Sequence, residues 1–327
     1  MTFRSKVRDY KRRVAEIKAS LKKNPHEWGR FQSEFNQEIN GIFRELMLFE
    51  KENSAHGKEE KVYKLKRLFV ERFRADFVAG KYLQHSLGKP YGYAGDFEII
   101  DMIYQNDPVS IGFDRLYDNY FQMSTICVAV RNRKEDFKRL IAEAIRDAKS
   151  QKYYLLDLAS GPCRDLHEVY AGHEFQGTEG EVHCYDADQH AIDYAKKLNS
   201  RYPQLHYFRE NAVRMALIKD IEAKIPQKYD LIYSTGLFDY LDYRVAVRLV
   251  SNLKKLLKKG GTLAISDVRD KFSNPSIYFM EWVADWELIY RDDDNFRRIF
   301  LDAGFDKSQL TFAYEQQGVM QYIIARA

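Results

Sequence analysis

Apolar residues recur every three or four positions in the first part of the chain, a spacing that places them on one face of a helix. The stretches that share this pattern are residues 7–21, 31–46, 62–77 and 113–149. The second and third of them are rich in Phe, which favours a packed helical core. We therefore expect residues 1–150 to form an all-helical N-terminal domain.

The pattern changes near residue 150, where short apolar runs begin to alternate with amphipathic stretches. The predicted strands are residues 153–157, 182–185, 205–208, 229–234, 262–266, 310–314 and 319–325. Alternation of strands and helices implies parallel pairing, with helices on both faces of the sheet. We expect an α/β fold in which residues 151–327 form a mostly parallel sheet of seven strands.

The composition is that of an ordinary folded protein, with 327 residues, 45% of them hydrophobic and 31% charged. No run of about 18 apolar residues exists, and the first residues lack the apolar segment of a signal peptide. Cys127, Cys163 and Cys184 show no spacing typical of a zinc site or a disulfide framework. We expect a cytoplasmic protein with no transmembrane segment and no metal.

Basic residues are concentrated at the start of the chain. Residues 1–24 hold nine Lys or Arg against Asp9 and Glu16. Such an arm can bind nucleic acid or anionic lipid, but it is also typical of a solvated helix face. We favour the solvated face and expect no nucleic-acid partner, because no aromatic residues are interleaved with the charges. The sequence leaves the oligomeric state open.

The segment GKPYGYAGD at residues 88–96 interrupts the helical pattern with three glycines and a proline. Asp96 is placed to cap the helix that follows. A turn between helices does not need two tyrosines, and tyrosines in loops often serve binding. We therefore favour a ligand contact for Tyr91 and Tyr93 over a plain turn.

The segment YYLLDLASGPCRD at residues 153–165 predicts a buried strand, a tight turn and a helix. This arrangement holds nucleotide-like ligands at the carboxyl end of the strand. Ala159 and Cys163 occupy the places where a dinucleotide-binding turn has its outer glycines, and only Gly161 remains. A pyrophosphate requires that close backbone approach, so a ligand without phosphates, such as S-adenosylmethionine, fits better.

An acidic residue follows the second predicted strand at Asp186, well beyond the position expected in a dinucleotide site. An acid at this place can accept both hydroxyl hydrogens of a ribose. Together with the turn around Gly161, it predicts a donor site for S-adenosylmethionine.

Five segments of the second half resemble, in order and spacing, the core motifs of class I S-adenosylmethionine-dependent methyltransferases, which have a Rossmann-like sheet. They are LLDLASGPCRD, CYDADQHAIDYAKK, the region of Asn211, YDLIYSTGLFDYLD and LLKKGGTLAISD. The resemblance implies that Asp157 and Gly161 shape the methionyl pocket and that Asp186 binds the ribose. It places Asn211 and Ala212 near the adenine amine. Ala159, Ala187 and Ser234 complete the predicted cofactor-binding set.

A narrower resemblance covers more of the chain. KPYGYAGDFEIIDMIY, AVRNRKEDF, STGLFDYLDYRVA and NPSIYFMEWVADWELIYR are similar to a bacterial subfamily whose named members are described as 3-hydroxypalmitate methyl ester (extracellular factor) biosynthesis methyltransferases. This resemblance implies ligand roles for Tyr91, Tyr93, Asp96 and Arg131. Arg131 suits a clamp on the donor's carboxylate, although a surface ion pair is the other interpretation.

The acceptor side is predicted from residues after the fourth strand, from the tyrosine loop and from a later aromatic segment. The candidates are Tyr91, Tyr93, Asp239, Tyr240, Glu281, Trp286, Tyr290 and Arg291. Among them, Tyr91, Tyr93, Asp239 and Tyr290 are our catalytic candidates. The helical domain is expected to form a lid or a side wall over a small acceptor, with aromatic residues that provide an apolar cavity.

The segment Ser234 to Leu237 stands where base-modifying enzymes carry an Asn/Asp-Pro-Pro-aromatic turn, which argues against a nucleic-acid substrate. We expect methylation of a small molecule, with the carboxylate of a fatty or hydroxy acid as one acceptor class. The alternatives are N- or O-methylation of a polar metabolite and a non-catalytic, donor-binding regulatory protein.

Overall fold

The computed structural model describes residues 3–148, 152–172, 175, 178–273 and 275–327. The chain divides into two compact units, one of Met1–Val128 with Lys271–Glu287 and one of Ala129–Asp270 with Leu288–Ala327. We call them the helical unit and the sheet unit. The sequence predicts a single boundary at residue 150. In the structure the sheet unit begins already at Ala129, and the later segment Lys271–Glu287 belongs to the helical unit.

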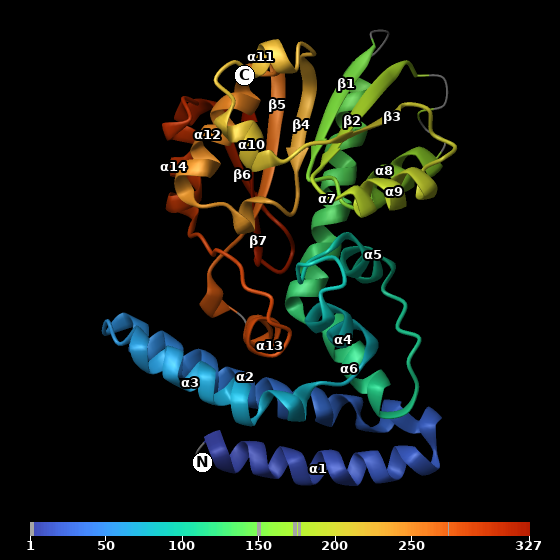
Figure 1. The fold of residues 1–327 in the computed structure, drawn as a ribbon, viewed down its shortest axis with the longest axis vertical. Coiled ribbons are helices and arrows are strands. Elements are labelled where there is room, and N and C mark those ends of the chain that lie inside the picture. The colour runs from blue at the N-terminus through green and yellow to red at the C-terminus, as the bar shows by residue number, and fades with distance from the viewer. Residues whose placement is uncertain (1–2, 149–151, 173–174, 176–177, 274) are drawn as a thin grey trace. The chain divides into compact units, whose positions relative to one another are not determined.

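Helices build the whole of the helical unit (Figure 1). Its elements are α1 (Phe3–Lys23), η1 (Pro25–Trp28), α2 (Gly29–Ala55), α3 (Glu59–Arg72), η2 (Arg74–Phe77), α4 (Lys81–Gly88), α5 (Phe97–Gln105), α6 (Gly112–Met123), the first residues of α7 (Thr125–Asp147), η4 (Lys271–Ser273) and α13 (Ser276–Trp282). The predicted helical character is confirmed.

One predicted helix is in fact two. The prediction of a continuous helix from Phe113 to Lys149 is wrong at Ser124, where α6 ends and α7 begins. Ser124 leaves the helical conformation, with φ −59° and ψ 142°, and its hydroxyl donates to the carbonyl of Phe121 at 2.6 Å. A serine in this conformation typically precedes a new helix. The predicted end at Lys149 lies outside the described residues.

The Phe stripes form the core of the helical unit, as predicted. The rings of Phe43 and Phe69 lie 6.1 Å apart, and Phe77 packs against both. Phe279 and Trp282 of α13 join the same cluster at 5.5 and 5.6 Å. These rings bury one another, which is typical of a packed core.

Much of the basic charge of α1 is paired within the helical unit. Lys6 bonds Glu45 at 2.7 Å, and Lys11 bonds Asp76 at 3.0 Å. The fork of Arg13 reaches Glu34 at 2.6 Å. These contacts agree with a helix face that is held by neighbouring acids, although exposed pairs of this kind stabilise a fold by only about 0–1 kcal/mol.

The sheet unit is built on seven strands in the order β3-β2-β1-β4-β5-β7-β6, with β7 antiparallel to its neighbours (Figure 1). The strands are β1 (Tyr153–Leu158), β2 (Gly180–Asp186), β3 (Leu205–Arg209), β4 (Tyr229–Ser234), β5 (Leu257–Val268), β6 (Leu310–Tyr314) and β7 (Met320–Arg326). The strand order reverses between β1 and β4, and ligands of open α/β sheets bind at such a point. The predicted α/β, Rossmann-like fold is confirmed.

β5 starts earlier than predicted, because two glycines that look like a preceding turn lie inside it. The pairing of β4 with β5 shifts register between Tyr229 and Leu231. At Gly261 a Cβ atom would lie 2.8 Å from the carbonyl oxygen of Tyr229, closer than van der Waals contact allows. Gly260 has φ +78°, which favours glycine. The two glycines therefore form an irregularity in the strand instead of its start.

Helices cover both faces of the sheet, as predicted. The remaining elements are α8 (Arg164–Ala171), α9 (Gln189–Leu198), α10 (Ala212–Leu217), α11 (Ile221–Lys224), η3 (Phe238–Tyr240), α12 (Tyr243–Lys255), α14 (Asp293–Asp302) and η5 (Lys307–Gln309). On one face α10, α12 and α14 share an apolar cluster with β1, β4 and β5. On the other, Phe137 of α7 packs against Tyr233 and Tyr322.

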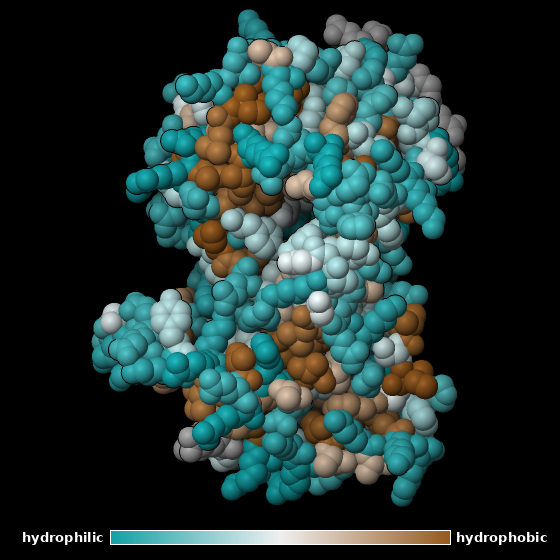
Figure 2. All heavy atoms as spheres, viewed as in Figure 1, coloured by the Kyte–Doolittle hydropathy of each residue, from teal (hydrophilic) through white to brown (hydrophobic). Residues whose placement is uncertain are grey.

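Hydrophilic side chains dominate the molecular face drawn in Figure 2, with apolar residues in smaller groups between them. None of the described helices is both long and apolar enough to cross a membrane.

Candidate active site

The turn between β1 and α8 is built from alternating left-handed residues. Ala159, Gly161 and Cys163 have φ values of +56°, +54° and +49°. Left-handed backbone costs an L-residue about 1–2 kcal/mol, so the two side-chain-bearing positions store strain. The positions noted in the sequence as missing outer glycines thus keep the glycine-like conformation, and the turn keeps its shape.

Asp186 at the end of β2 joins this turn to the next one. Its Oδ2 accepts the Gly161 N–H at 2.8 Å, and its Oδ1 accepts the Asp188 N–H at 2.9 Å. Burial raises the pKa of Asp186 above its ordinary value. A carboxylate has about four lone-pair sites, so Asp186 keeps acceptor capacity for the hydroxyls of a ribose.

A cavity of about 410 Å³ opens beyond the ends of β2 and β3. The lining residues are Ala187, Arg209, Glu210, Asn211 and Arg214. Asn211 caps α10, because its Oδ1 accepts the N–H groups of Val213 at 2.9 Å and Arg214 at 3.1 Å. Ala212 is buried behind it. The structure thus brings two predicted cofactor residues, Ala187 and Asn211, to one cavity.

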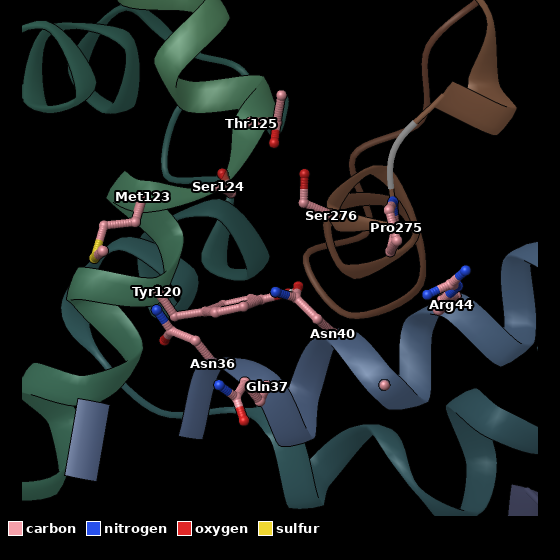
Figure 3. A pocket seen from close by; sticks show the side chains of 11 residues that line it. Asn36, Gln37, Asn40, Arg44, Tyr120, Met123, Ser124, Thr125, Pro275 and Ser276 are labelled. Carbon is pink, nitrogen blue, oxygen red and sulfur yellow. The ribbon is translucent and has the colours of Figure 1, made fainter. Parts of the chain in front are cut away.

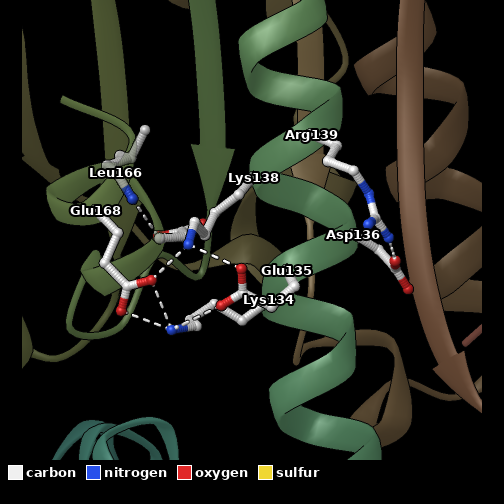
Figure 4. A network of polar contacts seen from close by, with 8 residues as sticks. Lys134, Glu135, Asp136, Lys138, Arg139, Leu166 and Glu168 are labelled. Carbon is white, nitrogen blue, oxygen red and sulfur yellow. Dashed lines mark hydrogen bonds and ion pairs between the residues drawn. The ribbon is translucent and has the colours of Figure 1, made fainter. Parts of the chain in front are cut away.

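α8 begins directly after the turn and is fixed to α7 by an ionic network (Figure 4). The Nζ of Lys134 donates to both carboxylate oxygens of Glu168, at 2.6 and 2.7 Å. Lys138 bonds Glu168 at 2.7 Å and Glu135 at 2.8 Å. Lys134 is buried, so this network is less screened by solvent than a surface pair.

Behind the turn lies a cluster of buried acidic and thiol groups. Asp157, Cys163 and Cys184 bring ligand-type atoms within 4.8 Å of one another. Pairing of β1 with β2 places Asp157 beside Cys184, so the sequence spacing gave no sign of the cluster. Burial, followed by the charge of Asp165, raises the pKa of Asp157 well above its ordinary value. A hydrogen bond with Cys184, together with burial, raises the pKa of the Cys163 thiol. The raised pKa disfavours the thiolate, which is the form that metals bind.

Asp165 gives the site a predicted pH dependence. Burial raises its pKa to about 6, against 3.8 for an ordinary Asp. The unfolded chain therefore releases this proton at lower pH than the folded chain, and stability is lost as the pH rises from about 4 through 6. Asp165→Asn keeps an acceptor for the Leu166 N–H and removes this loss. We expect the two proteins to melt similarly near pH 4 and the variant to be more stable by about 1–3 kcal/mol at pH 7.

Thermal melts from pH 4 to 7.5 measure this difference. A gap between the two proteins that stays constant across the range would contradict the prediction.

Ser234 at the end of β4 contacts the last residue of β1, directly before the turn. It is fully buried, and its hydroxyl donates to the carbonyl of Leu158 at 2.7 Å. Its side chain therefore braces the ends of β4 and β1 against each other.

Four charged side chains lie buried together at the ends of β4 and β5. Asp239 of η3 is 3% exposed, and its Oδ1 accepts the Val268 N–H at 2.7 Å. Its Oδ2 lies 3.9 Å from Nη1 of Arg133. Burial raises the pKa of Asp239, and Arg133 opposes that rise. The Nε of Arg133 is buried and has no hydrogen-bond partner among the described residues.

Arg291 closes the other side of this cluster. Its guanidinium donates to Oδ1 of Asp267 and to the carbonyl of Phe238, both at 2.9 Å, and to the carbonyl of Leu241. Burial, followed by the charge of Asp239, raises the pKa of Asp267 well above its ordinary value. Arg291 thus holds the segment after β4 in place.

The other acceptor-side candidates are more dispersed. Within the sheet unit, Tyr290 is half-buried and Tyr240 is 47% exposed. Arg131, the predicted clamp on the donor's carboxylate, lies half-buried on α7. Glu281 and Trp286 belong to the helical unit and are buried there. Glu281 pairs with Lys271 at 2.7 Å.

The tyrosine loop connects α4 to α5 in the helical unit. Tyr91 packs its ring 4.5 Å from Phe97, and its hydroxyl donates to Glu98 at 3.2 Å. Tyr93 is 39% exposed. The loop thus presents one anchored and one exposed ring.

Asp96 has the capping role that the sequence predicts. Its Oδ1 accepts the N–H groups of Glu98 at 3.0 Å and Ile99 at 2.9 Å. His85 contacts the same carboxyl at 2.9 Å, and the side chain is fully buried. These contacts explain Asp96 without a ligand.

Sequence reasoning assigned no role to Arg133, Asp165 or Asp267. A signal existed for Arg133, because it precedes the buried Phe137 by four residues and so shares its helix face. For Asp165 and Asp267 the burial comes from long-range packing, which no local pattern shows.

Residues 156–263 match the family model described as a methyltransferase domain. The match runs from β1 into β5 and includes Asp157, Gly161, Asp186 and Asn211. No protein with a curated function matches the chain.

The solved structures that resemble the chain include two with TM-scores above 0.5. A possible exported protein from Bordetella parapertussis has a TM-score of 0.58 at 19% identity, over 75% of this chain and 85% of that one. The CMeT domain of the citrinin polyketide synthase has a TM-score of 0.53 at 15% identity, over 84% of this chain and 67% of that one. At these identities the similarity establishes the fold alone.

The domain match, the strand order and the site around Asp186 agree with one another. Residues 156–263 form a methyltransferase domain on the Rossmann-like sheet, and this match supports the predicted S-adenosylmethionine-dependent methyltransferase activity and its cofactor.

Proposed function

We propose that the protein methylates the carboxylate of a small molecule such as a fatty or hydroxy acid. The observation that carries this proposal is Arg133, which lies beside the segment that follows β4. Its side chain is buried, and its Nε has no hydrogen-bond partner among the described residues. A guanidinium binds carboxylates well because its donors form a planar fork. The resemblance to the 3-hydroxypalmitate methyl ester subfamily supports the same acceptor class.

The donor would be held by the predicted cofactor residues. Asp186 accepts the ribose hydroxyls, Ala187 and Asn211 line the cavity for the adenine, and Gly161 with Asp157 faces the methionyl part. Ala159 and Ala212 support these contacts through the backbone, and Ser234 supports them through the bond from its hydroxyl to Leu158. S-adenosylmethionine supplies a methyl group on a positively charged sulfur, and transfer needs an aligned acceptor and exclusion of water.

The acceptor's chemistry decides which groups act. A carboxylate is already a nucleophile near neutral pH, so it needs orientation and no base. A hydroxyl or amine would need a proton acceptor, for which Asp239 is the candidate because its pKa is raised by burial. Arg131, Tyr91 and Tyr93 remain proposed ligand residues on the strength of the subfamily resemblance, and Tyr290 remains a proposed acceptor-side residue. The carboxyl of Asp96 is already used to cap α5 and to bind His85, so Asp96 is assigned to positioning the tyrosine loop.

A panel of acceptors tests the proposal. The full chain is incubated with S-adenosylmethionine and either fatty acids, 3-hydroxy acids or amines, and both S-adenosylhomocysteine and product masses are measured. Methyl esters of the acids are the expected products. Methylation confined to amines would overturn the carboxylate assignment, and donor binding without turnover on any acceptor would favour the regulatory alternative.

A further inference from the structure

A second cavity lies wholly within the helical unit (Figure 3). It occupies about 410 Å³ among α2, the junction of α6 with α7, and the start of α13. The lining residues are Asn36, Gln37, Asn40, Gly41, Arg44, Tyr120, Met123, Ser124, Thr125, Pro275 and Ser276. Most of these side chains are polar, and no role in methyl transfer has been assigned to any of them.

The cavity carries positive charge without a counter-charge. Its lining contains no Asp or Glu, and Arg44 is its only charged residue. Arg44 makes no ion pair with any residue that the structure describes. Two carboxylates of the same helix, Glu45 and Glu50, bind Lys6 at 2.7 Å and Lys271 at 2.9 Å instead. The guanidinium of Arg44 is therefore available to an anion.

Two amide side chains in the lining have their acceptor oxygens engaged by the protein. Oδ1 of Asn36 accepts from Gln32 at 2.8 Å, and Oδ1 of Asn40 accepts from the Tyr120 hydroxyl at 2.9 Å. Burial raises the pKa of Tyr120, so its hydroxyl stays protonated and keeps donating. Each amide is left with N–H donors for a ligand, and a ligand rich in acceptors satisfies them.

The N-terminal end of α7 adds to this preference. Thr125, its first residue, lines the cavity, and the first N–H groups of a helix carry partial positive charge. Met123, Pro275 and the ring of Tyr120 supply apolar wall, which suits an organic molecule more than a bare ion. The volume falls within the range of about 300–1,000 Å³ that is usual for small-molecule sites.

We propose that this cavity binds a small organic anion, a carboxylate or a phosphate ester, through Arg44, Asn36 and Asn40. The site goes beyond the proposed methyl transfer and does not depend on it.

Calorimetric titration of the full chain tests the site with three probes: glycerol 3-phosphate, 3-hydroxybutyrate and uncharged glycerol. We expect saturable one-to-one binding of at least one of the two anions and none of glycerol. Arg44→Gln should weaken anion binding at least about tenfold, because it removes a charge-assisted hydrogen bond. Asn40→Asp should weaken it as well, because it places a negative charge in the lining.

Arg30→Gln is the matched control, since Arg30 is also exposed on α2 but pairs with Glu27 and lies outside the cavity. It should leave the affinity unchanged. Because Arg44 is exposed, we expect Arg44→Gln to fold normally. Circular dichroism of the variant checks this. Absence of saturable binding of both anions, or equal affinities in wild type and Arg44→Gln, would overturn the site.

The Asp186→Ala variant distinguishes anion binding at this cavity from anion binding at the donor site. Anion binding that persists in this variant supports the proposal, whatever happens to the binding of S-adenosylmethionine. Anion binding that disappears with Asp186 would assign the anion to the donor site and overturn the proposal.

Discussion

Replacement of Asp186 by Ala is expected to lower the affinity for S-adenosylmethionine by roughly 100-fold or more. The carboxylate is the predicted acceptor for two ribose hydroxyls, and a hydrogen bond to a charged group contributes about 1.5–3 kcal/mol. The change also removes the bond from the Gly161 N–H and the bond from the Asp188 N–H. The turn that carries Gly161 would then lose its tie to β2. Calorimetric titration with the donor and with S-adenosylhomocysteine measures the loss.

Asp193→Ala is the control for this experiment. Asp193 is an exposed acid on α9 near Asp186 in the sequence, and its carboxylate accepts a bond from Gln189 at 2.9 Å. Its replacement should leave donor affinity within about a factor of two, because surface changes of this kind have small effects. Donor affinity that is unchanged in Asp186→Ala would refute the assignment of the donor site.

The second large effect is expected at Arg291. Arg291→Met leaves Asp267 without its cation and leaves the carbonyls of Phe238 and Leu241 without a donor. Breaking a buried ion pair from one side costs about 3–5 kcal/mol, because the remaining charge stays buried. Urea unfolding followed by circular dichroism should show this loss. Adding Asp267→Leu should recover part of it, since the orphaned acid is then removed.

Arg297→Met is the matched control, because Arg297 pairs with the exposed Asp294 on the surface of α14. An exposed pair contributes about 0–1 kcal/mol, so the unfolding midpoint should move little. Equal losses of unfolding free energy in the Arg291 and Arg297 variants would show that the buried cluster contributes no more to stability than an exposed ion pair.

The sequence predicted the sheet well because a buried parallel strand can be recognised from a short, continuous apolar run. The apolar run of residues 153–156 lies within β1, and Asp157 and Asp186 lie near the carboxyl ends of β1 and β2. The cap at Asp96 was equally local, since it depends on the next three residues. A turn after residue 158 was predicted from Gly161 and its neighbours, but the left-handed backbone at Ala159 and Cys163 was not, because these residue types do not favour it.

What the sequence did not reveal depends on contacts between distant segments. Asp157 and Cys184 meet only because β1 pairs with β2 in one register. The cluster of Asp239, Asp267, Arg133 and Arg291 draws on three elements and the connection before α14, and burial there comes from packing. The break at Ser124 was missed because apolar spacing continues on both sides of it.

The segment Lys271–Glu287 has a consequence for how the protein can be dissected or exchanged. It interrupts the sheet unit in sequence and supplies Phe279 and Trp282 to the aromatic core of the helical unit. A fragment that stops near residue 150 would lack these rings and leave Phe43 and Phe69 beside an unfilled space. A chimera that carries the helical unit into another protein must therefore transplant two separate stretches of chain together, and recombination at a single crossover cannot shuffle the unit intact.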